Sequence, residues 1–158
     1  RTANKAVANR VVGDVEGRLD QAIRQRAATV EVDDVVDIVG DRALIAQALQ
    51  NLVANAIAYT PHDRTPLVKV AVRPVGSNWE LTVSDNGAGV PLEERQEIFE
   101  MFRRGSVGVA QSPPQQGSGL GLALCRRVAE RHGGNIEVRD SPQGGAEFVI
   151  RLPQRELV

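Results

Sequence analysis

The chain has 158 residues, 42% of them apolar, which suffices for the core of a single globular domain. Its 19 basic and 20 acidic residues leave a net charge of -1, so the overall charge attracts neither nucleic acid nor an anionic membrane surface. One cysteine, Cys125, excludes an internal disulfide, and its apolar neighbours predict a buried thiol in a reducing compartment. No apolar run reaches the roughly 20 residues that cross a bilayer, and the start at Arg1 leads us to expect a piece of a longer protein.

Apolar spacing divides the chain into helical and β-rich segments. Asp41 is a typical N-cap for a helix that Pro61 must end. Antiparallel hairpins with the helices gathered elsewhere predict an α+β fold, a two-layer α/β sandwich forming a single domain. In chain order, the predicted elements are a helix at 12–23, β-rich runs at 28–32 and 36–39, a helix at 41–59, strands at 67–73 and 79–85 around a turn at 74–78, a short helical stretch near 92–102, a mobile loop rich in Gly, Ser, Pro and Gln at 104–118, a helix at 119–132, and strands at 135–139 and 146–152.

Three glycines, Gly117, Gly119 and Gly121, fall within five positions at the start of the last predicted helix. Glycines before a helix leave backbone N–H groups and the positive end of the helix dipole free, which suits phosphate. A dinucleotide-binding fingerprint is a rival, but it needs a strand running into the glycines, and Leu122 occupies its last glycine position. A loop in which the glycines merely allow a turn is the other alternative.

Asp85 ends a predicted strand and shares its face with the apolar residues of that strand, so its carboxylate should point toward the core. A buried carboxylate requires hydrogen-bond donors, and an exocyclic amine of a ligand is one candidate. Gly87 and Gly89 would let a flat ligand approach the backbone closely. The alternative is an aspartate that only makes a hairpin turn, but Pro91 and a charged helical segment follow it instead of a returning strand.

Asn51, Asn55 and Tyr59 are four residues apart, so they share one face of the predicted helix. A solvated polar stripe is the ordinary explanation, although asparagine is a weak helix former. Amide oxygens also suit a Mg²⁺ ion that keeps several waters and phosphate oxygens. Arg103 and Arg104 lead into the mobile loop, where their charges are able to meet a terminal phosphate.

Four stretches occur in the order NLVANAIAYTP (51–61), DNGAGV (85–90), IFEMFRRG (98–105) and GSGLGLAL (117–124). This order resembles the N, G1, F and G2 boxes of the ATP-binding catalytic domain (HATPase_c) of bacterial two-component sensor histidine kinases, in the GHKL group of gyrase, chaperone, kinase and mismatch-repair ATPases. The resemblance covers about residues 28–152. It implies a Bergerat fold, in which a mixed and mostly antiparallel sheet packs against helices, with residues 104–118 as a mobile ATP lid.

The resemblance also implies roles for individual residues. Asn55 would bind Mg²⁺, Asn51 would support the phosphate side, and Tyr59 would lie near the adenine. Asp85 would accept a hydrogen bond from the adenine amine. The rest of the implied ATP site comprises Gly87 and Gly89 beside the base, and Gly117, Ser118, Gly119, Leu120, Gly121 and Leu122 around the phosphates.

Arg103 and Arg104 are the implied catalytic residues, supported by Asn51, and the resemblance supplies no general base. Arg104 matches the arginine that ends the F box. The chain departs from the family pattern at Ala58, where many members carry a basic residue that contacts phosphate. It also departs at Ala146 and Glu147, which occupy positions that are often Ser or Thr.

Position 51 distinguishes the branches of this group. In the gyrase, chaperone and mismatch-repair branches it is usually a glutamate that serves as general base, whereas Asn51 cannot take a proton. Efficient hydrolysis is therefore not expected. A kinase that passes phosphate to an imidazole can rely on positioning and charge neutralisation. The alternatives to a histidine kinase are a nucleotide sensor that transfers nothing and an ATP hydrolase that drives conformational change.

The segment HDRTPL (62–67) is similar to the phosphoacceptor box of these kinases, but it is one residue short. Pro61 and Pro66 bracket it, so no helix can pass through His62. His132 is expected in the last turn of a helix, where a partial positive charge is favourable. The phosphoacceptor is therefore expected on a separate dimerisation domain.

The expected organisation is a linker or helix at residues 1–27, leading in from that missing dimerisation domain, followed by the catalytic domain at 28–158. The expected partners are the histidine-bearing dimerisation domain of the same kinase and a cognate response regulator, with no nucleic acid. The isolated domain should be a monomer and the parent kinase a homodimer. ATP and Mg²⁺ are the expected cofactors, and the domain should be cytoplasmic, whether or not the parent is a membrane-anchored sensor.

Overall fold

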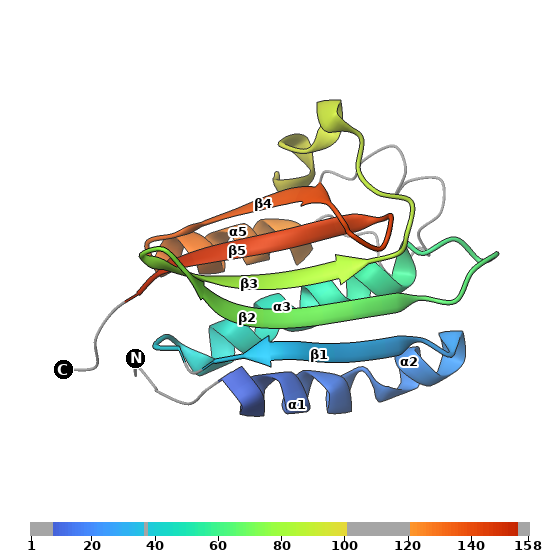
Figure 1. The fold of residues 1–158 in the computed structure, drawn as a ribbon, viewed down its shortest axis with the longest axis horizontal. Helices are drawn as coiled ribbons and strands as arrows, with labels where there is room; N and C mark the ends of the chain where they lie inside the picture. The colour runs from blue at the N-terminus through green and yellow to red at the C-terminus, as the bar shows by residue number, and fades with distance from the viewer. Residues whose placement is uncertain (1–7, 37, 101–120, 155–158) are drawn as a thin grey trace.

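The computed structural model describes residues 8–36, 38–100 and 121–154 (Figure 1). The helices are α1 (Ala8–Arg18), α2 (Asp20–Arg26), α3 (Arg42–Ala58) and α5 (Gly121–Arg131), with two short 3₁₀ helices, η1 (Leu92–Glu94) and η2 (Glu97–Phe99). The strands are β1 (Thr29–Val35), β2 (Leu67–Val75), β3 (Asn78–Asp85), β4 (Asn135–Asp140) and β5 (Ala146–Pro153).

The five strands form one sheet in the order β1-β2-β3-β5-β4. β1 runs parallel to β2, and all other neighbours are antiparallel. Helices α3 and α5 lie against one face of the sheet, while α1 and α2 run beside β1 at its edge (Figure 1). The prediction of an α+β sandwich with a mixed, mostly antiparallel sheet is confirmed.

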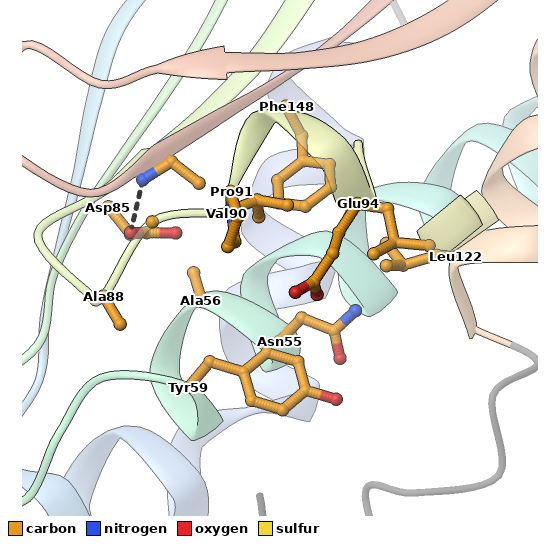
Figure 2. Close-up of a pocket in the computed structure, with 13 residues that line it drawn as sticks. Asn55, Ala56, Tyr59, Asp85, Ala88, Val90, Pro91, Glu94, Leu122 and Phe148 are labelled. Atoms are coloured by element: carbon orange, nitrogen blue, oxygen red, sulfur yellow. Dashed lines mark hydrogen bonds between the residues drawn. The ribbon is translucent and has the colours of Figure 1, made fainter. Parts of the chain in front are cut away.

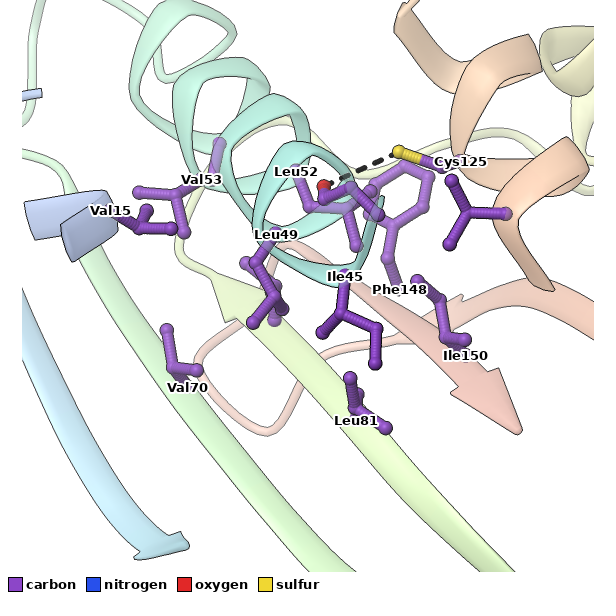
Figure 3. Packing of buried hydrophobic residues seen from close by; sticks show 14 of the residues in the cluster. Val15, Ile45, Leu49, Leu52, Val53, Val70, Leu81, Cys125, Phe148 and Ile150 are labelled. Atoms are coloured by element: carbon purple, nitrogen blue, oxygen red, sulfur yellow. Dashed lines mark hydrogen bonds between the residues drawn. The ribbon is translucent and has the colours of Figure 1, made fainter. Parts of the chain in front are cut away.

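Strand register explains how apolar side chains gather between the sheet and α3. Val83 of β3 pairs with Val70 of β2 and with Phe148 of β5, and all three side chains are buried. They meet a broad apolar face of α3, which includes Ile45, Leu49 and Leu52 (Figure 3). Asp85, two residues beyond Val83, lies on the same side of the sheet and is also buried.

The N-terminal helices join the same core. Val12 and Val15 of α1 and the linking residue Leu19 are buried in the cluster that contains the α3 side chains. The segment before β1 therefore packs on the domain. The boundary at residue 27, and a dimerisation domain before it, remain predictions.

Three predicted elements differ in detail. The helix predicted at 12–23 is divided at Leu19 into α1 and α2. The two β-rich runs give only one strand, because after β1 the chain turns inward and buries Ile38 completely. The stretch near 92–102 forms two 3₁₀ helices over its described part. Leu92 is exposed there and only Ile98 and Phe99 are buried, so no continuous apolar stripe supports an α-helix.

His132 joins the end of α5 to the start of α3. Its Nε2 atom accepts a hydrogen bond from the backbone N–H of Asp41 at 3.0 Å, and its Nδ1 atom lies 2.8 Å from the carbonyl oxygen of Val128. The position expected for His132, at the C-terminal end of a helix, is confirmed, because its backbone N–H donates to the Val128 carbonyl oxygen at 3.3 Å. Asp41 also caps α3, because its carboxylate accepts from the backbone N–H of Leu44 at 3.1 Å.

Replacing Ala27 with glycine should stabilise the domain. Ala27 ends α2 with φ of 53°, a left-handed conformation in which a Cβ atom is disfavoured. Glycine removes this strain, although it also increases the entropy of the unfolded chain, so we expect Ala27→Gly to raise the free energy of unfolding by up to about 1 kcal/mol.

Urea denaturation measures this change. The control is Ala28→Gly at the next residue, which lacks a positive φ and packs against the core. That substitution should lower stability. A loss of similar size in both variants would contradict strain at Ala27.

Candidate functional site

A pocket opens between the second half of α3, the segment that follows β3, the first turn of α5, and β5 (Figure 2). Its polar side chains are few and its walls are otherwise apolar. The lining residues are Asn55, Ala56, Tyr59, Asp85, Ala88, Gly89, Val90, Pro91, Glu94, Ile98, Leu122, Ala146 and Phe148.

Helix α3 places its polar residues beside its buried face. Asn55 and Tyr59 are half-buried and line the pocket, as their shared helical face predicts (Figure 2). Asn51 does not line it. Its amide nitrogen instead donates to the backbone carbonyl of Gly121 at 3.4 Å, which connects α3 to the first residue of α5.

Asp85 sits at the end of β3 with its carboxylate at the wall of the pocket. Its Oδ1 atom accepts two backbone hydrogen bonds, from Gly87 at 2.8 Å and from Ala146 at 2.9 Å. Burial raises the pKa of Asp85, and these two bonds oppose the rise. The other carboxylate oxygen turns toward the pocket (Figure 2), where a donor on a ligand can reach it.

The glycines around Asp85 have different functions. Gly89, with φ of 78°, lines the pocket. Gly87 does not line it, but a Cβ atom there would lie 3.1 Å from Asp85 Oδ1 and 3.3 Å from the carbonyl oxygen of Tyr59. Gly87 therefore lets the end of α3 and the loop after β3 approach each other.

Gly145 is a site residue that the sequence reasoning missed. A Cβ atom at this position would lie 2.1 Å from Asp85 Oδ1 and 2.4 Å from the Gly87 nitrogen. Its own N–H donates to the Asp85 carbonyl oxygen at 3.2 Å. The signal available in the sequence was the Gly-Gly pair just before the last strand, but nothing local indicated that it packs against a carboxylate 60 residues earlier.

The pocket has a polar end, where Asn55 and Glu94 lie, and an apolar middle (Figure 2). Val90, Ile98, Leu122 and Phe148 supply flat apolar walls suited to a planar ring. Glu94 is a lining residue that the sequence reasoning missed. Its carboxylate points toward the side chain of Asn55 (Figure 2).

Among the described residues, no group of three or more His, Cys, Asp or Glu residues is placed to hold a metal ion. A cation here would depend on an amide such as Asn55 and on oxygens of the ligand itself.

Several predicted site residues lie outside the described part of the chain. They belong to the segment 101–120, as does the whole of the predicted ATP lid at 104–118, and their roles stay predictions. These residues are Arg103, Arg104, Gly117, Ser118, Gly119 and Leu120.

Other residues singled out in the sequence are placed away from the pocket. Cys125 is completely buried, its Sγ atom lies 3.4 Å from the carbonyl oxygen of Ala48, and burial raises its pKa to about 12. The prediction of a buried thiol is confirmed. Glu147 belongs to the opposite face of the sheet, where it accepts hydrogen bonds from Ser84 and from Arg139. His62 is exposed in the loop between α3 and β2.

Comparison with known proteins agrees with this geometry. The model of the histidine kinase-, DNA gyrase B-, and HSP90-like ATPase family matches residues 40–156. The sensor-like histidine kinase SenX3 of Mycobacterium tuberculosis is 38% identical over an alignment of 149 residues, which covers 89% of this chain and 35% of that protein. The sensor-type histidine kinase PrrB of Mycobacterium leprae is 43% identical over 115 residues, 73% of this chain and 24% of that protein. The chain thus spans about a third or less of the length of these relatives.

Two solved structures share the fold over almost the whole chain. The catalytic domain of histidine kinase ThkA superposes with a TM-score of 0.79 at 25% identity, covering 98% of this chain and 97% of that one. The ATP-binding domain of PrrB from Mycobacterium tuberculosis has a TM-score of 0.68 at 30% identity, covering 99% and 100%.

The fold and the pocket together define an ATP-binding domain of the two-layer α/β class. The chain belongs to the histidine kinase-, DNA gyrase B-, and HSP90-like ATPase family, and within it to the catalytic domains of sensor histidine kinases.

Replacing Asp85 with asparagine should weaken nucleotide binding without lowering the stability of the domain. An amide oxygen can still accept from Gly87 and Ala146, but the amide nitrogen would face a ligand donor, which costs about 1–3 kcal/mol of binding free energy. We expect weaker ATP binding and less discrimination between ATP and GTP by calorimetry. Unchanged affinity and base preference would remove Asp85 from the recognition of the base.

The same variant gives a pH dependence. Because burial raises the pKa of Asp85 above its ordinary value of 3.8, the folded chain holds the carboxyl proton more tightly than the unfolded chain does. The stability that the protonated carboxyl contributes is therefore lost as pH rises through the folded-state pKa. Asp85→Asn should therefore be at least as stable as the parent chain at pH 7. The parent should gain stability relative to the variant as pH falls toward 3.8. A constant difference between them would contradict the raised pKa.

Replacing Gly145 with alanine should damage the pocket directly. The new Cβ atom would displace the Asp85 carboxylate, so we expect a loss of about 2 kcal/mol in the free energy of unfolding and about tenfold weaker ATP binding. Gly144→Ala is the matched control, because its φ of 101° makes alanine strained while no atom lies within 4 Å. The control should lose stability and keep ATP affinity. Equal affinity losses in both variants would argue against a specific contact with Asp85.

Proposed function

We propose that this chain binds Mg-ATP and donates the γ-phosphate to a histidine on a separate dimerisation domain. The observation that carries the proposal is the Asp85 carboxylate, with one oxygen fixed by two backbone N–H groups and the other turned to an apolar pocket. A group held in this way matches an amine on a flat base. Sensor histidine kinases among the relatives support the transfer to histidine.

Each end of the pocket would meet a different part of the nucleotide. Asp85 would accept from the adenine amine between apolar walls, and Tyr59 would border the base. Asn55 would hold Mg²⁺ through its amide oxygen, and the ion would reduce the negative charge of the phosphates. The residues present fit such an ion, because a hard amide ligand lies at the polar end of the pocket.

Transfer needs an acceptor nucleophile and no general base. The imidazole nitrogen would form a bond to the γ-phosphorus as the bond to the ADP oxygen breaks, and ADP would leave with the electron pair. Asn51 cannot accept a proton, and it is engaged with Gly121. Arg103 and Arg104 would neutralise the charge that develops on the phosphoryl group.

Under this proposal, the chain's own histidines would not supply that nucleophile. His62 is exposed on a loop, and both ring nitrogens of His132 are engaged between α3 and α5. The acceptor would therefore lie on the dimerisation domain of the same kinase, and residues 1–27 would lead in from it. The parent would be a homodimer, whereas the isolated domain would be a monomer.

A response regulator would receive the phosphate from the histidine. One structural neighbour, ThkA, has been solved in complex with the response regulator TrrA. None of the described helices is long and apolar enough to cross a membrane. Because ATP is a cytoplasmic substrate, the domain would work in the cytoplasm.

Mixing the chain with the histidine domain of its own kinase tests the proposal. With radiolabelled ATP and Mg²⁺, acid-labile label should appear on the histidine domain and not on this chain. Tethering normally supplies a millimolar effective concentration, so high concentrations of both domains are needed. Asn55→Ala should abolish the label, while Gln47→Ala on the exposed side of α3 should leave it unchanged.

Two other results would identify the alternative functions. ATP binding without label on either domain would favour a nucleotide sensor. Rapid release of inorganic phosphate by the chain alone would favour a hydrolase of the gyrase type. Label on His62 would overturn both the assignment of the acceptor and the division into domains.

A further inference from the structure

Arg26, the last residue of α2, reaches across to the C-terminal end of α3. Its guanidinium donates to three backbone carbonyl oxygens, those of Ile57 at 2.9 Å, Thr60 at 3.0 Å and Pro61 at 3.4 Å. These partners are 31 to 35 residues away in the sequence. The N-terminal segment therefore contacts the end of α3 through hydrogen bonds, in addition to its apolar contacts with the core.

This interaction has a specific physical basis. The last carbonyls of a helix lack intrahelical partners and carry partial negative charge, so a cation that donates several hydrogen bonds is favourable there. The planar guanidinium offers five donors in a fixed fork, which suits several carbonyls better than a lysine ammonium does. The left-handed turn at Ala27 ends α2 immediately after Arg26.

The carbonyls that Arg26 binds flank Tyr59, which lines the pocket. The residues at the C-terminal end of α3, Tyr59 and Thr60, also pack against the loop after β3. Gly87 packs against them closely enough that a Cβ atom would lie 3.3 Å from the Tyr59 carbonyl and 3.6 Å from the Thr60 Cα atom. Gly87 in turn donates to Asp85 Oδ1. A continuous chain of contacts thus runs from α2, through the end of α3, to the carboxylate that faces the pocket.

We propose that Arg26 is a positioning residue that couples the N-terminal helices to the base end of the nucleotide pocket. By holding the end of α3, it sets the place of Tyr59 and of the loop that carries Asp85. A displacement of α2 would then change nucleotide affinity without any change in the residues that touch the nucleotide. This inference rests on the proposed ATP binding.

Substitution of Arg26 tests the coupling. Arg26→Gln removes the charge and most of the donors, and we expect adenosine and ATP to bind about fivefold more weakly or worse. Arg26→Lys keeps the charge and should restore part of the affinity. The control is Arg24→Gln, two residues earlier, which removes an arginine whose side chain is 79% exposed and forms a surface ion pair with Asp20. The control should bind as the parent chain does.

A spectroscopic readout separates positioning from simple loss of stability. Tyr59 is the only tyrosine of the chain, so incorporation of fluorotyrosine gives a single fluorine resonance at the edge of the pocket. In the nucleotide-free protein this resonance should shift or broaden in Arg26→Gln, move less in Arg26→Lys, and stay unchanged in Arg24→Gln. Urea denaturation establishes that each sample is folded under the conditions of the measurement.

The possible outcomes are distinct. Unchanged affinity and an unchanged resonance in folded Arg26→Gln would overturn the proposal, even if that variant were less stable. If Arg26→Gln does not fold, the comparison of Arg26→Lys with Arg24→Gln decides, because parent-like affinity and resonance in Arg26→Lys would overturn it. Failure of the parent chain to bind adenosine or ATP would instead reject the proposed function.

Discussion

The pocket depends on one buried carboxylate whose two oxygens have different surroundings. Asp85 at the end of β3 is joined through one oxygen to its own loop, at Gly87, and to the start of β5, at Ala146. These backbone donors offset part of the cost of burying a charge and fix the direction of the second oxygen. The carboxylate can approach this closely only because Gly145 has no side chain. The second oxygen is thus already oriented toward the pocket in the ligand-free protein. The burial of the ionised carboxylate lowers the free energy of unfolding of that ligand-free protein.

Helix α3 carries two of the polar pocket residues and is fixed at both ends by distant parts of the chain. At its start, the backbone N–H of Asp41 donates to His132 at the end of α5. At its end, Arg26 binds the last carbonyls from α2. Between these points, the apolar face of α3 packs on the sheet. The position of Asn55 and Tyr59 therefore depends on residues that never contact the pocket.

The sequence predicted well what depends on local periodicity. The two hairpins follow from alternating residues, and strand parity alone turned Asp85 toward the core. The pairing of β1 with β2 is parallel and separated by a helix, so no local signal revealed it. Gly145, Arg26 and the contact of His132 with Asp41 were missed for the same reason. Their partners lie 31 to 91 residues away, and a glycine that permits a close approach resembles one that merely permits a turn.

The buried thiol of Cys125 has a further consequence. It is the chain's only cysteine, and it lies where α5 meets α3, with its Sγ atom beside the Ala48 carbonyl (Figure 3). A thiol reagent can reach it only when these two helices separate. Leu122 and Asn55, which line the pocket, belong to those same helices. The rate of thiol modification therefore measures how often the walls of the pocket come apart, a motion that any ligand held between them must slow.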